Sequence, residues 1–181
     1  MCEKGHEWQA TVINRTLMKQ NCPKCSEHRR VSFPEKAIFY YIKQVFPKAE
    51  ENFKIPYTRN AELDIFIEDI NLGIEYDGSY YHKRQGRDAK KYSICKEYGI
   101  SLIRVREQDC SVLNDIATAC YYLKAPNNKD LDNAIKFVFT YINDNYESVK
   151  TPDIDIERDS VNIFNLIEFQ EKENSLINKS P

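Results

Sequence analysis

Two neighbouring segments, ELDIFI (62–67) and LGIEYDG (72–78), place carboxylates within short aliphatic runs typical of buried β-strands. Residues two apart on a strand share a face, so Glu75 and Asp77 point the same way. If the two segments pair, Asp64 comes close enough to share a metal ion with them. Burying three carboxylates without a partner would be costly, so the sequence predicts a compensating positive charge. A divalent cation would supply that charge, and the alternative is a salt-bridge network with Arg59, Lys83 or Arg104.

The same region carries groups that suit phosphodiester hydrolysis. Mg²⁺ prefers oxygen ligands and lowers the pKa of an attacking water, and Asp64 and Glu75, with Asp77 beside them, are predicted to supply those oxygens. His82 follows the second segment closely. Its imidazole has an unperturbed pKa near neutrality, so we expect it to take or relay a proton.

The remaining pattern predicts a mixed α/β (α+β) fold. Ser32 and Glu35 form a capping box, S-x-x-E, at the start of a predicted helix. Arg104 and Glu107 are expected to close the site from a neighbouring strand. Helices are predicted at 34–46, 83–97, 112–123, 131–146 and 160–171, and further strands at 53–57 and 100–106.

The predicted helix at 83–97 is strongly basic where it begins, directly after His82. A run of charge is often only a solvated helix face. Its position at the end of the carboxylate site favours contact with phosphate instead. Asp88 is expected to orient His82 or to hold a metal-bound water, and the alternative is an ordinary ion pair with Arg84. The predicted DNA-binding residues are Lys83, Arg84, Arg87, Lys90 and Lys91.

The overall composition suits a soluble globular protein, and the charge is unevenly distributed. The chain of 181 residues has a net charge of −2, which alone argues against a nucleic-acid ligand. Residues 1–31 carry +3, residues 32–124 are balanced, and residues 125–181 carry −5. Attraction to DNA depends on local basic surface, so the basic front is consistent with one DNA-facing side. No apolar run approaches the length of a membrane span, and a cytoplasmic location is expected.

The first 31 residues contain the spacing C-x3-H-x15-C-x2-C, formed by Cys2, His6, Cys22 and Cys25. A segment this short, with one Trp and few aliphatic residues, cannot build a core, so a structural Zn²⁺ is predicted. His28 is an alternative fourth ligand. Disulfides are the competing interpretation and are disfavoured without a secretion signal. Cys95, Cys110 and Cys120 are expected to be buried thiols.

Residues 33–110 resemble the very-short-patch-repair endonucleases of the PD-(D/E)XK nuclease superfamily. The motifs are LDIFI, LGIEYDG and SYYHK, followed by RDAKKYSICKEYGISLIRVRE. The resemblance implies a restriction-endonuclease-like mixed central sheet flanked by helices, with Asp64 and Glu75 as metal ligands. Glu35 would be an extra acid leaning over the metal. The superfamily's usual lysine falls at Asp77, whereas the repair subgroup also lacks it and uses histidines, one of which matches His82.

The segment CEKGHEWQATVINRT…CPKC resembles a zinc-ribbon repeat of bacterial and phage proteins, in which copies recur in tandem. That resemblance implies the same four zinc ligands and leaves His28 out. ENSLINKSP near the C-terminus resembles the start of an inter-repeat linker, so the chain is expected to be a fragment of a longer protein. Three regions are predicted: a zinc ribbon at 1–31, a nuclease-like core at 32–124 and a helical extension at 125–181.

These observations predict a metal-dependent DNA endonuclease of the mismatch-repair, homing or restriction type, acting in a bacterial or phage-infected cell. The expected metals are structural Zn²⁺ and catalytic Mg²⁺. The alternative is a DNA-binding module whose nuclease fold no longer cleaves, and Asp77 in the lysine position is its best support. A purely structural protein would not explain acids on apolar strands.

Overall fold

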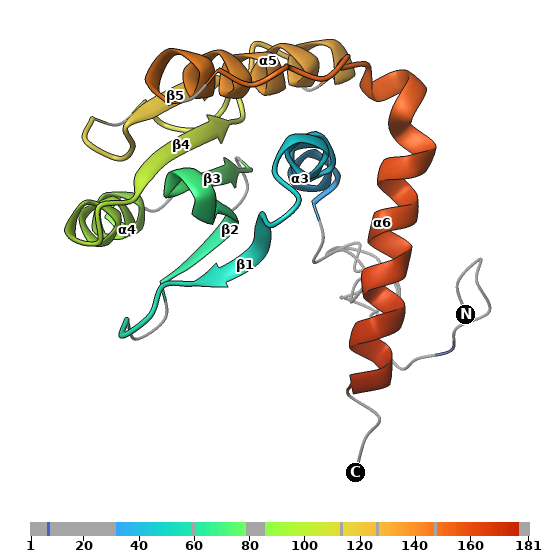
Figure 1. Ribbon diagram of the computed structural model, residues 1–181, viewed down its shortest axis with the longest axis horizontal. Coiled ribbons are helices and arrows are strands. Elements are labelled where there is room, and N and C mark those ends of the chain that lie inside the picture. The colour runs from blue at the N-terminus through green and yellow to red at the C-terminus, as the bar shows by residue number, and fades with distance from the viewer. Residues whose placement is uncertain are drawn as a thin grey trace, which may run out of the picture.

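The chain forms a mixed five-stranded sheet with the order β1-β2-β3-β4-β5 (Figure 1). The computed structural model describes residue 7 and residues 32–58, 61–78, 86–112, 114–125, 127–146 and 148–177, the last eleven by backbone only. β1 to β3 run antiparallel, and β4 and β5 continue the sheet parallel to β3. The strands are β1 (Glu50–Lys54), β2 (Glu62–Ile67), β3 (Leu72–Asp77), β4 (Ser101–Arg106) and β5 (Ala119–Tyr122).

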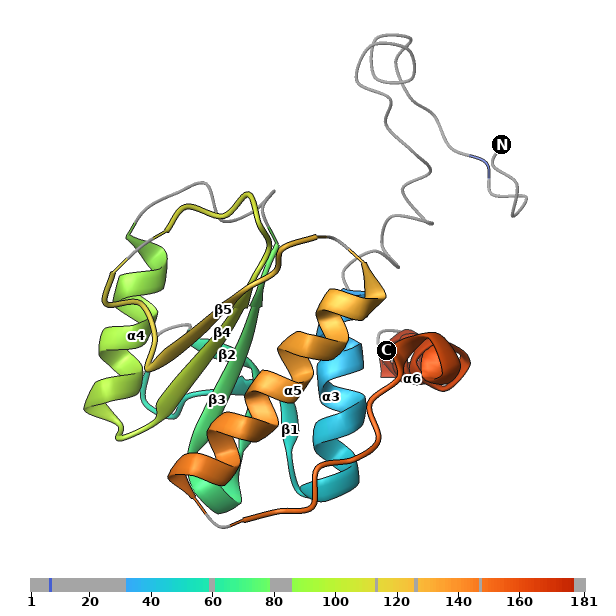
Figure 2. The same ribbon diagram turned by 90° about the horizontal axis from the view of Figure 1, so that it is seen from above.

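Helices cover both faces of this sheet. Figure 2 shows α4 (Arg87–Glu97) on one face and α3 (Phe33–Val45) with α5 (Asn128–Asn145) on the other. α6 (Ile156–Ile177) packs against the outer side of α3. The short 3₁₀ helix η2 (Glu68–Ile70) joins β2 to β3. Among the helices that the structure describes, none is long and apolar enough to cross a membrane.

Two hydrophobic clusters lie on opposite faces of the sheet. The larger joins the strands to α3, α5 and the start of α6, and it includes Ile65, Ile103 and Phe139. The smaller lies under α4 and includes Phe66 and Leu102. Strands buried on both faces need apolar residues at consecutive positions, which explains the aliphatic runs in the sequence. The region after residue 125 shares the larger core.

Two local signals in the sequence correspond to real helix ends. Ser32 is the N-cap of α3, as predicted, although its side chain makes no capping hydrogen bond. Gly99 follows α4 with φ 66°, a left-handed conformation that favours glycine. The Ile100 amide then donates to the Cys95 carbonyl at 2.8 Å and closes the helix end. Gly73 in β3 meets a different requirement, because a Cβ there would lie 3.0 Å from Leu63 Cδ1.

The prediction of a helix at 112–123 is wrong. Its apolar residues have helical spacing, but 119–122 form β5 and pair with β4. The Thr118 amide donates to the Leu102 carbonyl, and the Leu123 amide donates to the Arg106 carbonyl. The open edge of β4 therefore provides backbone partners that a local pattern cannot reveal. Other boundaries shift by a few residues: β1 begins at Glu50 and α6 at Ile156.

Candidate metal and phosphate site

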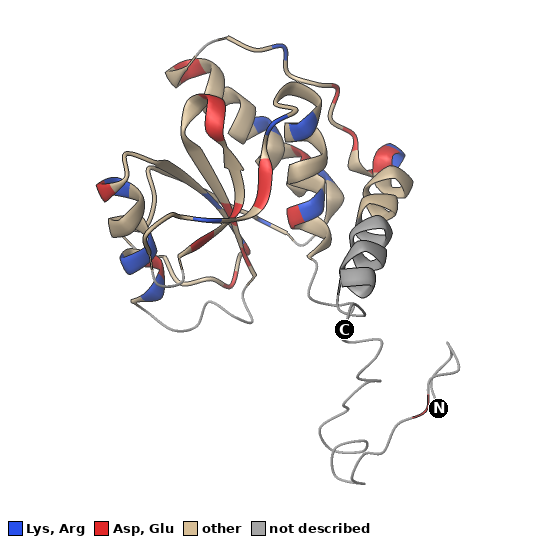
Figure 3. Ribbon diagram, turned by 60° about the horizontal axis from the view of Figure 1, so that its bottom comes forward, with Lys and Arg blue, Asp and Glu red and all other residues tan. Residues whose placement is uncertain are grey.

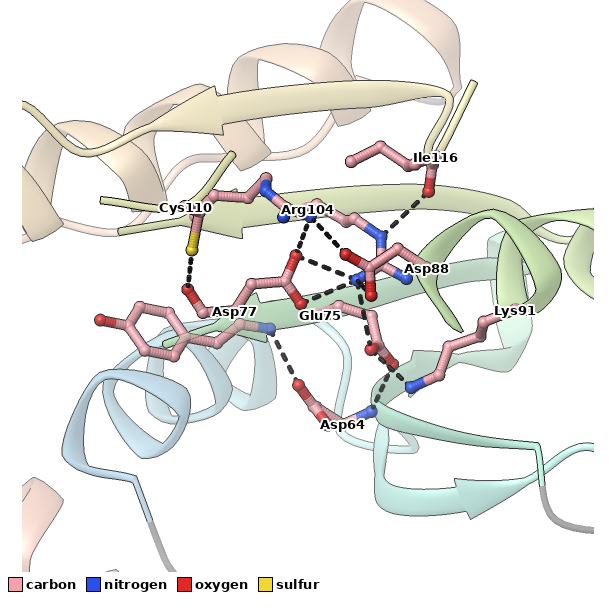
Figure 4. Close-up of polar contacts among 10 residues, drawn as sticks. Asp64, Glu75, Asp77, Asp88, Lys91, Arg104, Cys110 and Ile116 are labelled. Carbon is pink, nitrogen blue, oxygen red and sulfur yellow. Dashed lines mark hydrogen bonds and ion pairs between the residues drawn. The ribbon is translucent and has the colours of Figure 1, made fainter. Parts of the chain in front are cut away.

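The two acidic strands separate at Asp64 and Glu75. Pairing between β2 and β3 includes Ile65 with Ile74, and Asp64 and Glu75 come next in that register. At this point side-chain carboxylates, and not backbone carbonyls, accept hydrogen bonds from the amides of the opposite strand. The Asp64 amide donates to Glu75 Oε1 at 3.2 Å, and the Tyr76 amide donates to Asp64 Oδ2 at 2.8 Å. The structure thus places Asp64 next to Glu75 at the point where β2 and β3 separate, which we call the fork (Figure 4).

Glu35 adds a third negative charge from the first turn of α3. Burial is the largest cause that raises the pKa of Asp64 well above its usual range, and repulsion from Glu75 and Glu35 adds to it. Burial also raises the pKa of Glu35 to about 7, opposed by Lys36 and increased by Glu51 and Glu75. These carboxyls resist ionisation together, so a bound cation would relieve the repulsion.

Lys91 provides a positive charge within this group. Its Nζ lies 2.6 Å from Glu75 Oε2, and the side chains of Lys91 and Glu75 are 28% and 3% exposed. Burial alone lowers the pKa of Lys91, but attraction to Glu75 and Asp64 more than compensates, so the pKa lies above its usual value. Lys91 is therefore a protonated partner of Glu75 and not an ordinary surface cation.

Asp77 lies in a buried ion-pair network that neighbours Glu75 on the same face of the sheet. Parallel pairing aligns Glu75 with Arg104 and Asp77 with Arg106, so the charges of the two strands lie side by side. Asp77 receives hydrogen bonds from Arg104 Nη1 at 2.7 Å and from Arg106 Nη1 at 2.5 Å. Arg106 also donates to Asp88 of α4 at 3.0 Å. Two aspartates thus face two arginines.

Arg104 connects this network to Glu75 of the carboxylate pair. Arg104 Nη1 also lies 3.7 Å from Glu75 Oε2, and Arg104 Nε donates to the Ile116 carbonyl at 2.9 Å. The Cys110 thiol donates to the Asp77 carbonyl. Within the part of the chain that the structure describes, three buried nitrogens lack a hydrogen-bond partner: Arg104 Nη2, Arg106 Nε and Arg106 Nη2. Burying these guanidinium groups with unsatisfied nitrogens is costly, and their ion pairs with the two aspartates offset part of that cost.

The donor set fits a hard cation held mainly by water. Among the described residues, no three His, Cys, Asp or Glu side chains are arranged to hold a metal by themselves. Mg²⁺ commonly binds through only one or two carboxylates and keeps several waters. Asp64 and Glu75 satisfy that requirement, whereas Asp77 makes short ion pairs with arginines. Asp77 as a direct metal ligand stays a prediction.

The predicted DNA-binding residues on α4 differ in their surroundings. Arg87 and Lys90 are exposed, whereas Lys91 is partly buried against Glu75. Figure 3 shows basic (blue) segments on α4 and acidic (red) segments on the strands of the sheet. Several predicted site residues lie outside the residues that the structure describes: Cys2, His6, Cys22, Cys25, His82, Lys83 and Arg84.

The sequence interpretation missed the ion pairs that two basic residues make in the site. Arg106 was not singled out, and Lys91 was assigned only to DNA contact. The signal for Arg106 was its spacing of two from Arg104 on an apolar strand, matching Glu75 and Asp77 on the preceding strand. Asp88 was expected to act with His82 or Arg84, which lie outside the described residues, and it also accepts a hydrogen bond from Arg106. Glu107 accepts a hydrogen bond from the Tyr76 hydroxyl at 2.9 Å.

Comparison with known proteins informs the N-terminal module. A family model described as a probable treble clef zinc finger domain matches residues 1–28. This supports the predicted zinc module, and its description names a treble clef where the sequence analysis expects a zinc ribbon. No curated protein and no solved structure matches the chain.

Proposed function

We propose that this protein is a divalent-metal-dependent DNA endonuclease. The observation that carries the proposal is the pair formed by Asp64 and Glu75 at the fork of β2 and β3, with Lys91 paired to Glu75 and Glu35 near enough to raise the pKa of Asp64. Burial and the neighbouring carboxylates raise the pKa of Asp64, and such an arrangement costs stability and is common at functional sites. The zinc finger match at residues 1–28 and the exposed basic residues of α4 support DNA as the substrate.

Asp64 and Glu75 would hold Mg²⁺, which when bound polarises the scissile phosphate and lowers the pKa of the attacking water. Water oxygen forms a new bond to phosphorus while the bond from phosphorus to one ester oxygen breaks. One water proton passes to a base, and the departing oxygen takes up a proton. His82 is the predicted base, and Glu35, with a pKa of about 7, is a second group able to accept a proton near neutrality.

Plasmid cleavage tests this proposal directly. We expect wild-type protein to nick or cut plasmid DNA in Mg²⁺ or Mn²⁺, and Asp64→Asn and Glu75→Gln to abolish cleavage. DNA affinity should stay the same or rise slightly, because each change removes negative charge beside phosphate. Asp69→Asn is the matched control, since Asp69 is exposed in η2, outside the fork. Wild-type protein that binds DNA and never cuts it with either metal would refute the proposal.

The second candidate is a DNA-binding module without catalytic activity. It is favoured by the position of Asp77, whose carboxylate contacts Arg104 and Arg106. It is also favoured by the lack of a three-ligand group among the described residues. The same cleavage assay separates the two, because this candidate predicts DNA binding without cleavage in either Mg²⁺ or Mn²⁺.

A further inference from the structure

Lys91 differs from the other basic residues of α4 in what it contacts. Its ammonium group forms a 2.6 Å ion pair with Glu75 Oε2, whereas Arg87 and Lys90 are exposed. Lys91 lies three residues after Asp88, so one face of α4 presents both side chains to the sheet. The helix thereby inserts a cation into the acid pair from the side opposite α3 (Figure 4).

The contacts of Glu75 show what a metal ion would meet. Oε1 accepts the Asp64 amide, and Oε2 accepts the Lys91 ammonium. Asp64 Oδ2 is engaged by the Tyr76 amide. A divalent cation that Glu75 shares with Asp64 would approach the carboxylate oxygen that Lys91 already contacts. Two cations on one carboxylate repel each other, so the ammonium and the metal oppose each other's binding.

We propose that Lys91 competes with a divalent cation for Glu75 and, once displaced, contacts the phosphate that is cut. This inference depends on the proposed function. An ammonium has three N–H donors, and Glu75 is its hydrogen-bond acceptor among the described residues. The flexible four-carbon stem allows the group to turn while it remains next to the site. Lys91 is then a catalytic residue, and Lys90 a residue for flanking phosphates.

The proposal predicts that a single substitution of Lys91 raises the affinity for Mn²⁺ and lowers the rate of cleavage. Lys91→Gln keeps an N–H donor for Glu75 and removes the charge, so Mn²⁺ affinity should rise roughly tenfold because repulsion is lost. Cleavage at saturating Mn²⁺ should fall about a hundredfold or more, because the phosphate loses a cationic partner. A residue that only supports the fold would weaken both properties together. Lys91→Met, also neutral, carries the same expectations if Lys91→Gln does not fold.

The experiment is a calorimetric titration of Mn²⁺ into the zinc-loaded full chain, with plasmid cleavage measured in parallel. Lys96→Gln is the matched control, because Lys96 lies in the last turn of α4, is 51% exposed and pairs with Asp115, and it should change neither Mn²⁺ affinity nor the cleavage rate. Equal or weaker Mn²⁺ binding by the Lys91 variants overturns the competition. Tighter binding with an unchanged rate overturns the contact with phosphate. If wild type shows no Mn²⁺ binding that Asp64→Asn removes, the proposed function itself fails, and the inference fails with it.

Discussion

Replacing Glu35 by Gln should remove the part of a pH-dependent loss of stability that comes from Glu35. The pKa of Glu35 is raised from 4.5 to about 7 in the folded protein. Between these values the native state keeps a proton that the unfolded chain has lost, so stability falls as pH rises from 4.5 and levels off above 7. At about 1.4 kcal/mol per pH unit, the difference amounts to about 3 kcal/mol.

Urea unfolding at pH 4.5 and pH 8 measures this effect. We expect the free energy of unfolding of Glu35→Gln, relative to wild type, to rise by about 3 kcal/mol between the two pH values. Glu50→Gln is the control, because Glu50 is exposed on β1. The N-terminal zinc module is common to all three proteins, so its own pH dependence cancels in the comparison. Mn²⁺ at pH 8 should stabilise wild type more than Glu35→Gln, because a bound cation compensates the charge of Glu35.

An equal stability difference at both pH values would refute this reasoning. It would mean that Glu35 ionises with its ordinary pKa in the folded protein and does not share the buried charge of the fork. A difference of the opposite sign would place a cationic partner beside Glu35 that outweighs its burial. Either result would also remove Glu35 from the candidate proton acceptors.

Three further predictions follow from the other parts of the molecule. Purified protein should contain about one Zn²⁺ per chain, and elemental analysis without zinc or a Cys22–Cys25 disulfide would contradict the zinc module. His82→Ala should slow cleavage about a hundredfold and flatten the pH–rate profile near neutrality, whereas an unchanged rate would move proton transfer to another group. Asp77→Asn should lower the free energy of unfolding by roughly 3–5 kcal/mol in urea, because it leaves Arg104 and Arg106 undercompensated, and unaltered stability would show that Asp88 suffices.

The buried strands were predictable because their signal is local. Alternation of acids with Ile and Leu in residues 62–67 and 72–77 identified both strands, and the pairing brings Asp64 opposite Glu75. The capping position of Ser32 and the left-handed Gly99 were equally readable, since each depends on a few adjacent residues. In contrast, β5 was mistaken for helix, because its partner is the edge of β4 and that edge forms only on folding.

The roles of the charges could not be read from the sequence alone. The sequence by itself determined that carboxylates lie on apolar strands and need positive charge nearby, because unpaired burial is too costly. It did not determine which cation serves which acid, since candidates for that role come from different elements. The tertiary structure assigned Asp77 to Arg104 and Arg106 through the parallel register of β3 and β4. It assigned Glu75 to Lys91 through the packing of α4, because distances of a few ångströms between remote residues exist only in the folded chain.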